Sequence, residues 1–511
     1  MPEANTFNLL FYGFNLNQAK RFDSSLNIDS FYITTDFLKQ NESARLIQEQ
    51  RFIPKNLLEI QGTDEFNQIY SEVLKFYSYN KNSLPYERID SFNLSSNLIL
   101  SSLHLTTRGF LNSIDDSVHH FRQVFNVAVY LFESMRFKLI IMRTGPQSIF
   151  SNLLFHLASH FNCKVIYGEP INYGPHRWML NTNKKSSIES GLNPNLDPDQ
   201  INTILDEIFS KDDLSPDRSN INSISFKENS LRLFIKILRN LSLNFINIGY
   251  RFFSYSFYFL KNYFNSSKNY FAYHKKYPSR VYWKAHLKDL LRSVYLHIFY
   301  ALISYLDWRK LDKEEDFVVL LANYQPEKTS NPDSLTYFDL RNLAESVKVR
   351  TDKDTRIVYK EHPSTLFRLM KESFPRLGTL YRSIAFYKDL RKLGLIISPI
   401  EVDTEDLILN SKGIYCLTST AILNLNIGST KHSNFLELPI NVFGDRWFSQ
   451  LKNIISFEDN GQRNEKGKLS LRDLLNQQLS NGFYSLGEPG AYNEKVVDSL
   501  IPEIKDILKK L

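Results

Sequence analysis

Cysteine, glycine and proline are scarce in this sequence of 511 residues, which contains two cysteines, 18 glycines and 18 prolines. Two thiols are too few for a disulfide framework or for a zinc site built on several sulfur ligands. The low glycine and proline content excludes a collagen-like or low-complexity chain. Because Cys163 and Cys416 both lie in apolar, strand-like runs, we expect two reduced, buried thiols.

Long uncharged apolar runs are also absent. No window of about 20 residues is free of charge, which argues against a membrane-spanning helix. The first residues, MPEANTFNLLFYG, lack a basic region followed by a long apolar core, so we expect no secretory signal. With 42% hydrophobic and 23% charged residues, the chain is long enough for two to four globular domains. We expect a cytoplasmic protein.

The positive charge is concentrated in one segment. Residues 227–310 hold 15 Lys and Arg against three acidic residues, whereas the rest of the chain has more acidic than basic residues. The same segment is aromatic, because 12 of the 24 residues from Tyr250 to Tyr273 are Phe or Tyr. Such a surface suits the inner face of the plasma membrane, where the protein would be peripheral. The alternatives are inter-domain helices with their rings packed inward, and single-stranded nucleic acid, which no motif supports.

Short apolar runs alternate with helical patterns in two parts of the chain. The runs are residues 6–13, 29–36, 96–103, 138–145 and 164–170, followed by 316–323, 355–363, 393–400, 413–420 and 438–445. This alternation predicts an α/β protein with two Rossmann-like domains facing a cleft and an inserted helical segment. The predicted segments are an N-terminal domain over 1–180, a polar linker over 181–229, the aromatic-basic helices over 230–312, a second α/β domain over 313–450 and C-terminal helices over 451–511.

The run RIVYKEHP predicts a phosphate site. A strand there ends at Lys360 and Glu361, and Pro363 opens a helix with Ser364 near its start. The start of a helix offers N–H groups and partial positive charge to a phosphate, and His362 stands beside it. A second strand end delivers Thr418, Ser419 and Thr420 to the same edge of the sheet, and helix capping is the alternative function for these hydroxyls.

Five segments follow one another in a specific order in the second half of the chain. They contain Gln325 to Glu327, Lys360 to Pro363, Arg382 with Ser383, Phe386 and Tyr387, Thr418 to Thr420, and Phe443 to Trp447. In order and spacing they resemble the capsule polysaccharide biosynthesis family of bacteria. The resemblance implies a GT-B-type, Kdo-transferase-like glycosyltransferase. Its donor would be a nucleotide sugar, with a CMP-activated acidic sugar favoured, and its acceptor a glycan or glycolipid of the capsule or surface polysaccharide. No metal and no further cofactor are implied.

The same resemblance implies which residues bind the donor. His362 would contact the donor phosphate and act in catalysis, and Ser419 and Thr420 would contact the nucleotide. The full predicted set is Lys360, His362, Ser364, Ser419, Thr420, Gln325, Glu327, Arg382 and Ser383.

A base must remove the proton of the acceptor hydroxyl, and it should come from the first domain. Glu169, in the strand-like run KVIYGEP, is our choice over Asp115, Asp116 and His119 because strand ends face the cleft. Arg177 could bind an anionic acceptor or the carboxylate of a sugar.

Two alternatives to a glycosyltransferase remain at this point. The first is a CDP-polyol phosphotransferase-like enzyme, which would also use a His-Pro phosphate site. The second is a catalytically inactive, membrane-associated glycan-assembly factor. It is favoured because the family tends to have an acid and a His around a Pro where this sequence has Arg143 to Gln147.

Overall fold

The computed structural model describes separate parts of the chain. They are residues 8–14, 16–26, 30–34, 52–54, 64–80, 82–94, 98–99, 114–143, 146, 148–171, 177–182, 199, 202, 224–264, 279–312, 315–322, 337, 339–362, 365, 382–416, 483–484 and most of 501–509. The chain divides into two compact units. Unit 1 comprises 1–212, 442–444 and 472–511, and unit 2 comprises 213–441 and 445–471.

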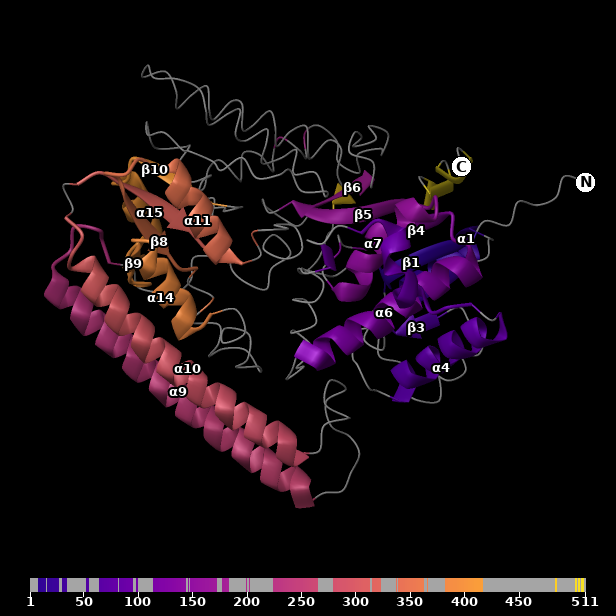
Figure 1. Ribbon diagram of the computed structural model, residues 1–511, viewed down its shortest axis with the longest axis horizontal. Helices are drawn as coiled ribbons and strands as arrows, with labels where there is room; N and C mark the ends of the chain where they lie inside the picture. Colours follow the sequence, from indigo (N-terminus) through magenta and orange to yellow (C-terminus); the bar gives the residue numbers. More distant parts are fainter. Residues whose placement is uncertain are drawn as a thin grey trace, which may run out of the picture. The chain divides into compact units, whose positions relative to one another are not determined.

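Unit 1 is built on a seven-stranded sheet in the order β11-β6-β5-β4-β1-β2-β3 (Figure 1). Its strands are β1 (Leu9–Phe14), β2 (Ser30–Thr34), β3 (Phe52–Pro54), β4 (Leu139–Met142), β5 (Lys164–Ile171), β6 (Arg177–Thr182) and β11 (Phe483–Tyr484). The first five are parallel, and β6 and β11 add antiparallel edge strands. The parallel order β3-β2-β1-β4-β5 is that of a Rossmann fold.

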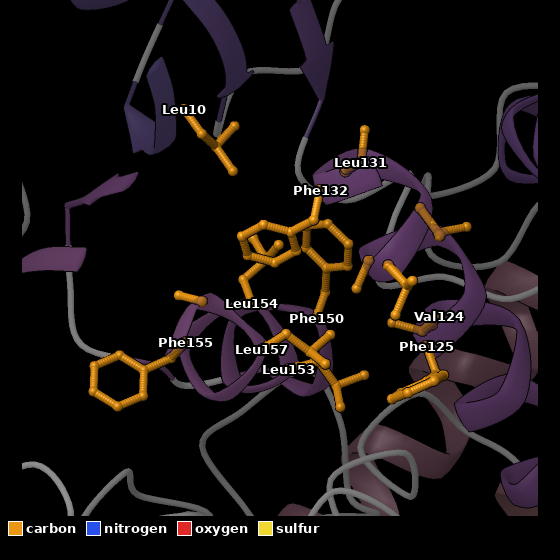
Figure 2. Packing of buried hydrophobic residues seen from close by; sticks show 14 of the residues in the cluster. Leu10, Val124, Phe125, Leu131, Phe132, Phe150, Leu153, Leu154, Phe155 and Leu157 are labelled. Atoms are coloured by element: carbon orange, nitrogen blue, oxygen red, sulfur yellow. The ribbon is translucent and has the colours of Figure 1, made fainter. Parts of the chain in front are cut away.

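Helices cover both faces of this sheet. They are α1 (Leu16–Leu26), α4 (Asp64–Tyr79), the 3₁₀ helix η1 (Pro85–Phe92), α6 (Ile114–Met135) and α7 (Ile149–His160). Residues of α4, α6 and α7 share one core with Leu10, Ile140 and Val165 of the sheet. In Figure 2, Phe132 of α6 and Phe150 of α7 point toward each other below Leu10. On the opposite face, Phe22 of α1 stacks on Phe11, with ring centroids 4.4 Å apart.

Unit 2 contains a four-stranded, all-parallel sheet in the order β10-β7-β8-β9. The strands are β7 (Phe317–Leu321), β8 (Arg356–Lys360), β9 (Ile396–Ser398) and β10 (Gly413–Tyr415), and the shorter helices are α11 (Leu340–Arg350), α14 (Ile384–Lys392) and α15 (Thr404–Leu409). Alternate strand residues enter two different cores. Val318 and Tyr359 pack with α11 and α14, whereas Val319 and Val358 pack with α15. This period-two alternation is what a sheet with both faces covered requires.

Two long helices belong to unit 2. They are α9 (Ser230–Phe264) and α10 (Ser279–Trp308), which lie side by side along the unit (Figure 1). Helix α10 packs against edge strand β9. The Tyr300 hydroxyl donates a hydrogen bond to the Ser398 carbonyl at 2.7 Å. Phe226 lies buried against Trp308 and Phe317. Ile224 and Phe226 therefore belong to a core of unit 2, just before the predicted boundary at 229.

The predicted fold class is confirmed for the described residues: they are α/β, with two Rossmann-like units and an inserted pair of long helices. One strand prediction was wrong and one strand was missed. Residues 98–99 of the predicted strand 96–103 are helical, and Phe52–Pro54 supplies the third parallel strand instead. A short apolar run has no periodicity that separates a buried helix from a strand. The predicted strand 438–445 lies outside the described residues.

The structure also bears on the two thiols and on the expectation that no helix spans a membrane. Cys163 and Cys416 are both buried, as expected, and burial raises the pKa of Cys163 to about 12. Within the described residues, no helix combines the length and the apolar character needed to cross a membrane.

Candidate functional site

The carboxyl ends of β7, β8, β9 and β10 meet at one edge of the second sheet. The chain moves from β7 to β8 to β9 and then returns to the other side of β7, so the strand order reverses between β7 and β10. Ligands of open α/β sheets bind outside the strand ends at such a switch point. The predicted donor residues Gln325 and Glu327 follow β7, and Ser419 and Thr420 follow β10. All four lie outside the described residues.

Glu361 is the best-defined group at this edge. Its carboxylate is fully buried and accepts five hydrogen bonds. The donors are Arg382 Nε at 2.6 Å and Nη2 at 3.0 Å, Tyr359 at 3.0 Å, Tyr387 at 2.9 Å and the backbone N–H of His362 at 3.0 Å. A buried carboxylate is tolerated only when it is paired and hydrogen-bonded, and here both oxygens are satisfied.

Arg382 completes this pair. It comes from the residues just before α14, is 2% exposed, and stacks over the Phe386 ring at 4.8 Å. Burial by itself would raise the pKa of Glu361. The positive charge of Arg382 and the hydrogen bonds from Arg382, Tyr387 and Tyr359 outweigh this effect and hold that pKa below its ordinary value. The structure thus gives Arg382 a structural role, and its predicted role in donor binding stays a prediction.

Lys360 points to the other face of the sheet, since neighbouring strand residues alternate. Its ammonium group is buried and donates to the carbonyls of Pro399 at 2.9 Å, Ile400 at 3.0 Å and Val402 at 2.5 Å. Burial lowers the pKa of Lys360 to about 8, opposed by the nearby carboxylates of Glu401, Asp403 and Glu361. All three donor positions of the ammonium are used for these carbonyls, and the predicted contact between Lys360 and a donor phosphate stays a prediction.

Ser383 caps a helix. It is the N-cap of α14, and its hydroxyl accepts a hydrogen bond from the Phe386 N–H at 3.1 Å. This is the capping function that serine commonly has at the start of a helix. A donor contact for the exposed Ser383 stays a prediction, and Ser364 lies outside the described residues.

His362 is the predicted phosphate-binding residue, and it lies in the described part of the chain. It follows β8 directly, and its side chain is half-buried. Its backbone is fixed on both sides, because its N–H donates to Glu361 and its carbonyl accepts from the Thr365 N–H at 2.9 Å. The buried Glu361–Arg382 pair therefore holds the turn that carries His362 at the carboxyl edge of the sheet.

The two tyrosines that bind Glu361 allow a direct test of this bracing. Burial, with the charge of Glu361 close by, raises the pKa of Tyr387 well above its ordinary value, so the phenol keeps its proton and donates. A hydrogen bond to a charged group contributes about 1.5–3 kcal/mol. We expect Tyr387→Phe to lower the free energy of unfolding of unit 2 by that amount in urea titrations. Tyr415→Phe is the control, since Tyr415 is buried in the same core but is not one of the tyrosines that donate to Glu361. Equal effects of the two changes would contradict the bracing.

In unit 1, Glu169 and Arg177 lie on neighbouring strands. Glu169 falls inside β5 and pairs with Met179, and Arg177 opens β6 opposite Ile171. Glu169 is therefore not the strand-end residue that was predicted. It lies in the part of β5 that continues beyond Tyr167, the last residue paired with β4. Both residues are at the carboxyl edge of the first sheet. Of the other base candidates, His119 lies exposed on α6, which also contains Asp115 and Asp116.

The strand order of the first sheet reverses between β1 and β4. Gly13 has a φ of +84° at the end of β1, where the register of β1 with β2 shifts. Arg143 follows β4 and donates its N–H to the Tyr12 carbonyl at 2.9 Å. Arg143 therefore lies directly after β4, at the carboxyl edge of the first sheet.

The central position of Glu361 and the hydrogen bonds that Tyr359 and Tyr387 donate to it were not predicted from the sequence. One signal could have found it: Lys360 and Glu361 are consecutive at the end of an otherwise apolar strand, and two buried charges on opposite faces each need their own partner. Within the described parts of the chain, no group of three or more His, Cys, Asp or Glu residues is arranged to hold a metal ion.

Neither a family model nor a curated protein matches this sequence. Among solved structures, the chain is similar to UDP-GlcNAc 2-epimerase from Methanocaldococcus jannaschii in complex with UDP-GlcNAc and UDP, with 12% identity and a TM-score of 0.20 over 96% of this chain and 99% of that one. It is also similar to UDP-GlcNAc 2-epimerase from Neisseria meningitidis bound to UDP-GlcNAc, with 11% identity and a TM-score of 0.19 over 98% and 99% of the two chains. At these scores the likeness carries no inference about a substrate or a reaction.

Proposed function

We propose that this protein is a glycosyltransferase that moves a sugar from a nucleotide donor onto a capsule or surface-polysaccharide acceptor. The favoured donor is a CMP-activated acidic sugar. The observation that carries the proposal is the position of His362 at the carboxyl edge of the second sheet, on a turn fixed by the buried Glu361 carboxylate. The order of the sequence motifs around that turn supports the same function.

In this proposal, His362 donates a hydrogen bond to the phosphate of the nucleotide sugar. Negative charge develops on that phosphate as the bond to the sugar breaks. A hydrogen-bond-donating group such as His362 that is already in position therefore stabilises the transition state. The rigid setting of His362 matters because a hydrogen bond that needs no reorganisation contributes most. The neighbouring strands β7 and β10 lead into the segments that would contact the nucleotide.

The acceptor side is assigned to unit 1. Glu169 would act as the base that removes the proton of the acceptor hydroxyl, and Arg177 would bind an anionic group of the acceptor or the sugar. Both belong to neighbouring strands at the carboxyl edge of the first sheet, which is where ligands of such sheets bind.

A nucleotide screen tests the proposal. The thermal unfolding of the protein is followed with CMP, CDP, UDP and GDP compounds, and a ligand at a hundred times its Kd should stabilise the fold by about 2.7 kcal/mol. We expect stabilisation by CMP and by CMP-sugars, and we expect His362→Ala to weaken it by about 10- to 100-fold in affinity, as for the loss of a hydrogen bond to a charged group. The matched control is His160→Ala, an exposed histidine in the last turn of α7.

The outcomes separate the candidate functions. Sugar transfer or donor hydrolysis that is as fast in His362→Ala as in the wild-type protein would refute the role of His362. Stabilisation and turnover with CDP-polyols alone would assign the polyol phosphotransferase. Binding of a nucleotide sugar without turnover of any donor would indicate the inactive assembly factor.

A further inference from the structure

Helix α9 has apolar side chains on two opposite sides. One side, with Leu233 and Ile237, is buried in the core of unit 2. The opposite side is exposed although it is apolar, and Leu231 and Ile246 are 62% and 66% exposed. This exposed stripe consists of Leu231, Phe234, Ile235, Leu238, Phe245, Ile246 and Phe253. The steps of three, four and seven residues place its members along one side of the helix.

Helix α10 carries a second exposed stripe. Its buried side, with Leu296, Tyr300 and Ile303, packs into unit 2. Its exposed apolar residues are Leu291, Tyr295, Leu302 and Leu306, which follow the same helical spacing. Single exposed apolar residues are normal on a protein surface, but contiguous stripes on two helices require an explanation.

The two stripes adjoin. Phe234 in the second turn of α9 contacts Tyr305 in the last turn of α10, with ring centroids 5.1 Å apart. The helices are therefore antiparallel, and they lie side by side in Figure 1. In both helices the exposed stripe begins beside the line of contact between α9 and α10 and continues on the side opposite the buried residues. The stripes form one apolar surface, which we call the hairpin face.

Basic residues border the hairpin face. Helical spacing places Arg232 and Arg239 along the outer edge of the α9 stripe, and Arg292 beside the α10 stripe. Two of the three acidic residues of 227–310 are already engaged in ion pairs, Glu228 with Arg232 at 3.1 Å and Asp307 with Arg391 at 3.1 Å. The helices thus combine an exposed apolar surface with a large excess of positive charge.

We propose that the hairpin face docks onto an anionic lipid bilayer, with its apolar side chains in the interface and its basic residues at the headgroups. Charge complementarity favours this occupant. The 15 Lys and Arg of residues 227–310 against three acids would repel a second copy of the same face, whereas they attract acidic lipids. The proposal is independent of the donor chemistry, and it would bring a sugar-transferring site to the surface where lipid-linked acceptors reside.

Vesicle sedimentation tests this proposal on the full chain. We expect the protein to sediment with vesicles of about 70% phosphatidylcholine and 30% phosphatidylglycerol at about 50 mM NaCl, and to be released at about 500 mM NaCl because salt screens the attraction. Leu238→Gln with Ile246→Gln should weaken binding by about tenfold or more, because both side chains lose their apolar burial in the interface. Arg239→Glu with Arg292→Glu should weaken it by a similar factor, at about fivefold for each removed positive charge.

The matched control is Val349→Gln on α11, an apolar side chain that is 87% exposed and lies outside the hairpin face. It should bind vesicles like the wild-type protein, and far-UV circular dichroism should show that every variant is folded. No sedimentation with the anionic vesicles at low salt would overturn the proposal. Equal binding to vesicles of pure phosphatidylcholine would also overturn it. A third contradicting result would be a dimer in light scattering that Leu238→Gln with Ile246→Gln converts to a monomer, while all variants bind vesicles equally.

Discussion

Replacing Glu361 with glutamine is expected to lower the free energy of unfolding of unit 2 by about 3–5 kcal/mol, because the change leaves the buried Arg382 charge without its partner. The two side chains are completely buried and joined by two hydrogen bonds, at 2.6 Å and 3.0 Å. Glutamine keeps the size and the shape of the side chain, so the loss reports the charge and not a cavity. Urea titrations with tryptophan fluorescence can follow unit 2, since Trp308 lies in its core.

A second substitution keeps this prediction falsifiable. Glu361→Gln combined with Arg382→Met removes both charges, and replacing a buried ion pair by neutral side chains of similar volume is often close to neutral. We expect the double variant to be more stable than Glu361→Gln alone. Strictly additive losses would show that the two charges do not interact. Glu315→Gln is the control, because Glu315 pairs with Arg356 on the surface and such pairs contribute at most about 1 kcal/mol.

The same pair predicts how stability depends on pH. The pKa of Glu361 is lower in the folded state than its ordinary value, so the unfolded chain binds the proton more readily. The stability from Glu361 is therefore complete above its ordinary pKa of about 4.3, and it is lost as the pH falls through the lower folded-state pKa. The stability difference between the wild-type protein and Glu361→Gln should narrow below about pH 4. A constant difference down to about pH 3 would contradict this assignment.

Lys360→Met is the second change with a large expected effect. Methionine fills a similar space, but the carbonyls of Ile400 and Val402 lose the ammonium that pairs with them. Each buried polar group left unsatisfied costs about 1–3 kcal/mol, so we expect a loss of about 2–5 kcal/mol. The Pro399 carbonyl is less affected, since it also accepts from the Ser398 hydroxyl at 3.2 Å.

Lys392→Met is the matched control for Lys360→Met. The Lys392 side chain is 79% exposed and pairs with Asp389 on the surface of α14, so its replacement should change the stability by no more than about 0.5 kcal/mol. If Lys360→Met proves as mild as Lys392→Met, the three carbonyl contacts do not hold the turn after β9. If Lys360→Met instead weakens nucleotide binding without a loss of stability, Lys360 is a ligand-binding residue after all.

Much of the fold could be predicted from local patterns. The buried strands β1, β4, β5, β7, β8, β9 and β10 coincide with apolar runs of the sequence. The helical patterns between these runs likewise predicted helices, and the structure contains α6 and α14 there. These elements were predictable because burial on a sheet or against a sheet imposes a period on the side chains. The three-residue strand β3 and the two-residue strand β11 have no such period, and their strand neighbours decide their conformation.

Composition and local periodicity were sufficient to predict the α/β class, the excess of positive charge in residues 227–310 and the position of His362 after a buried strand. The contacts of Lys360, Glu361 and Arg382 became known from the three-dimensional arrangement of the strands and helices. Lys360 and Arg382 were predicted to bind the donor. A cationic side chain at a strand end or before a helix can pair either with a bound phosphate or with a buried group of the protein, and the local sequence is the same in both cases. The partners of Lys360 lie 39 to 42 residues away and that of Arg382 lies 21 residues away, and no local pattern records a contact over such a separation.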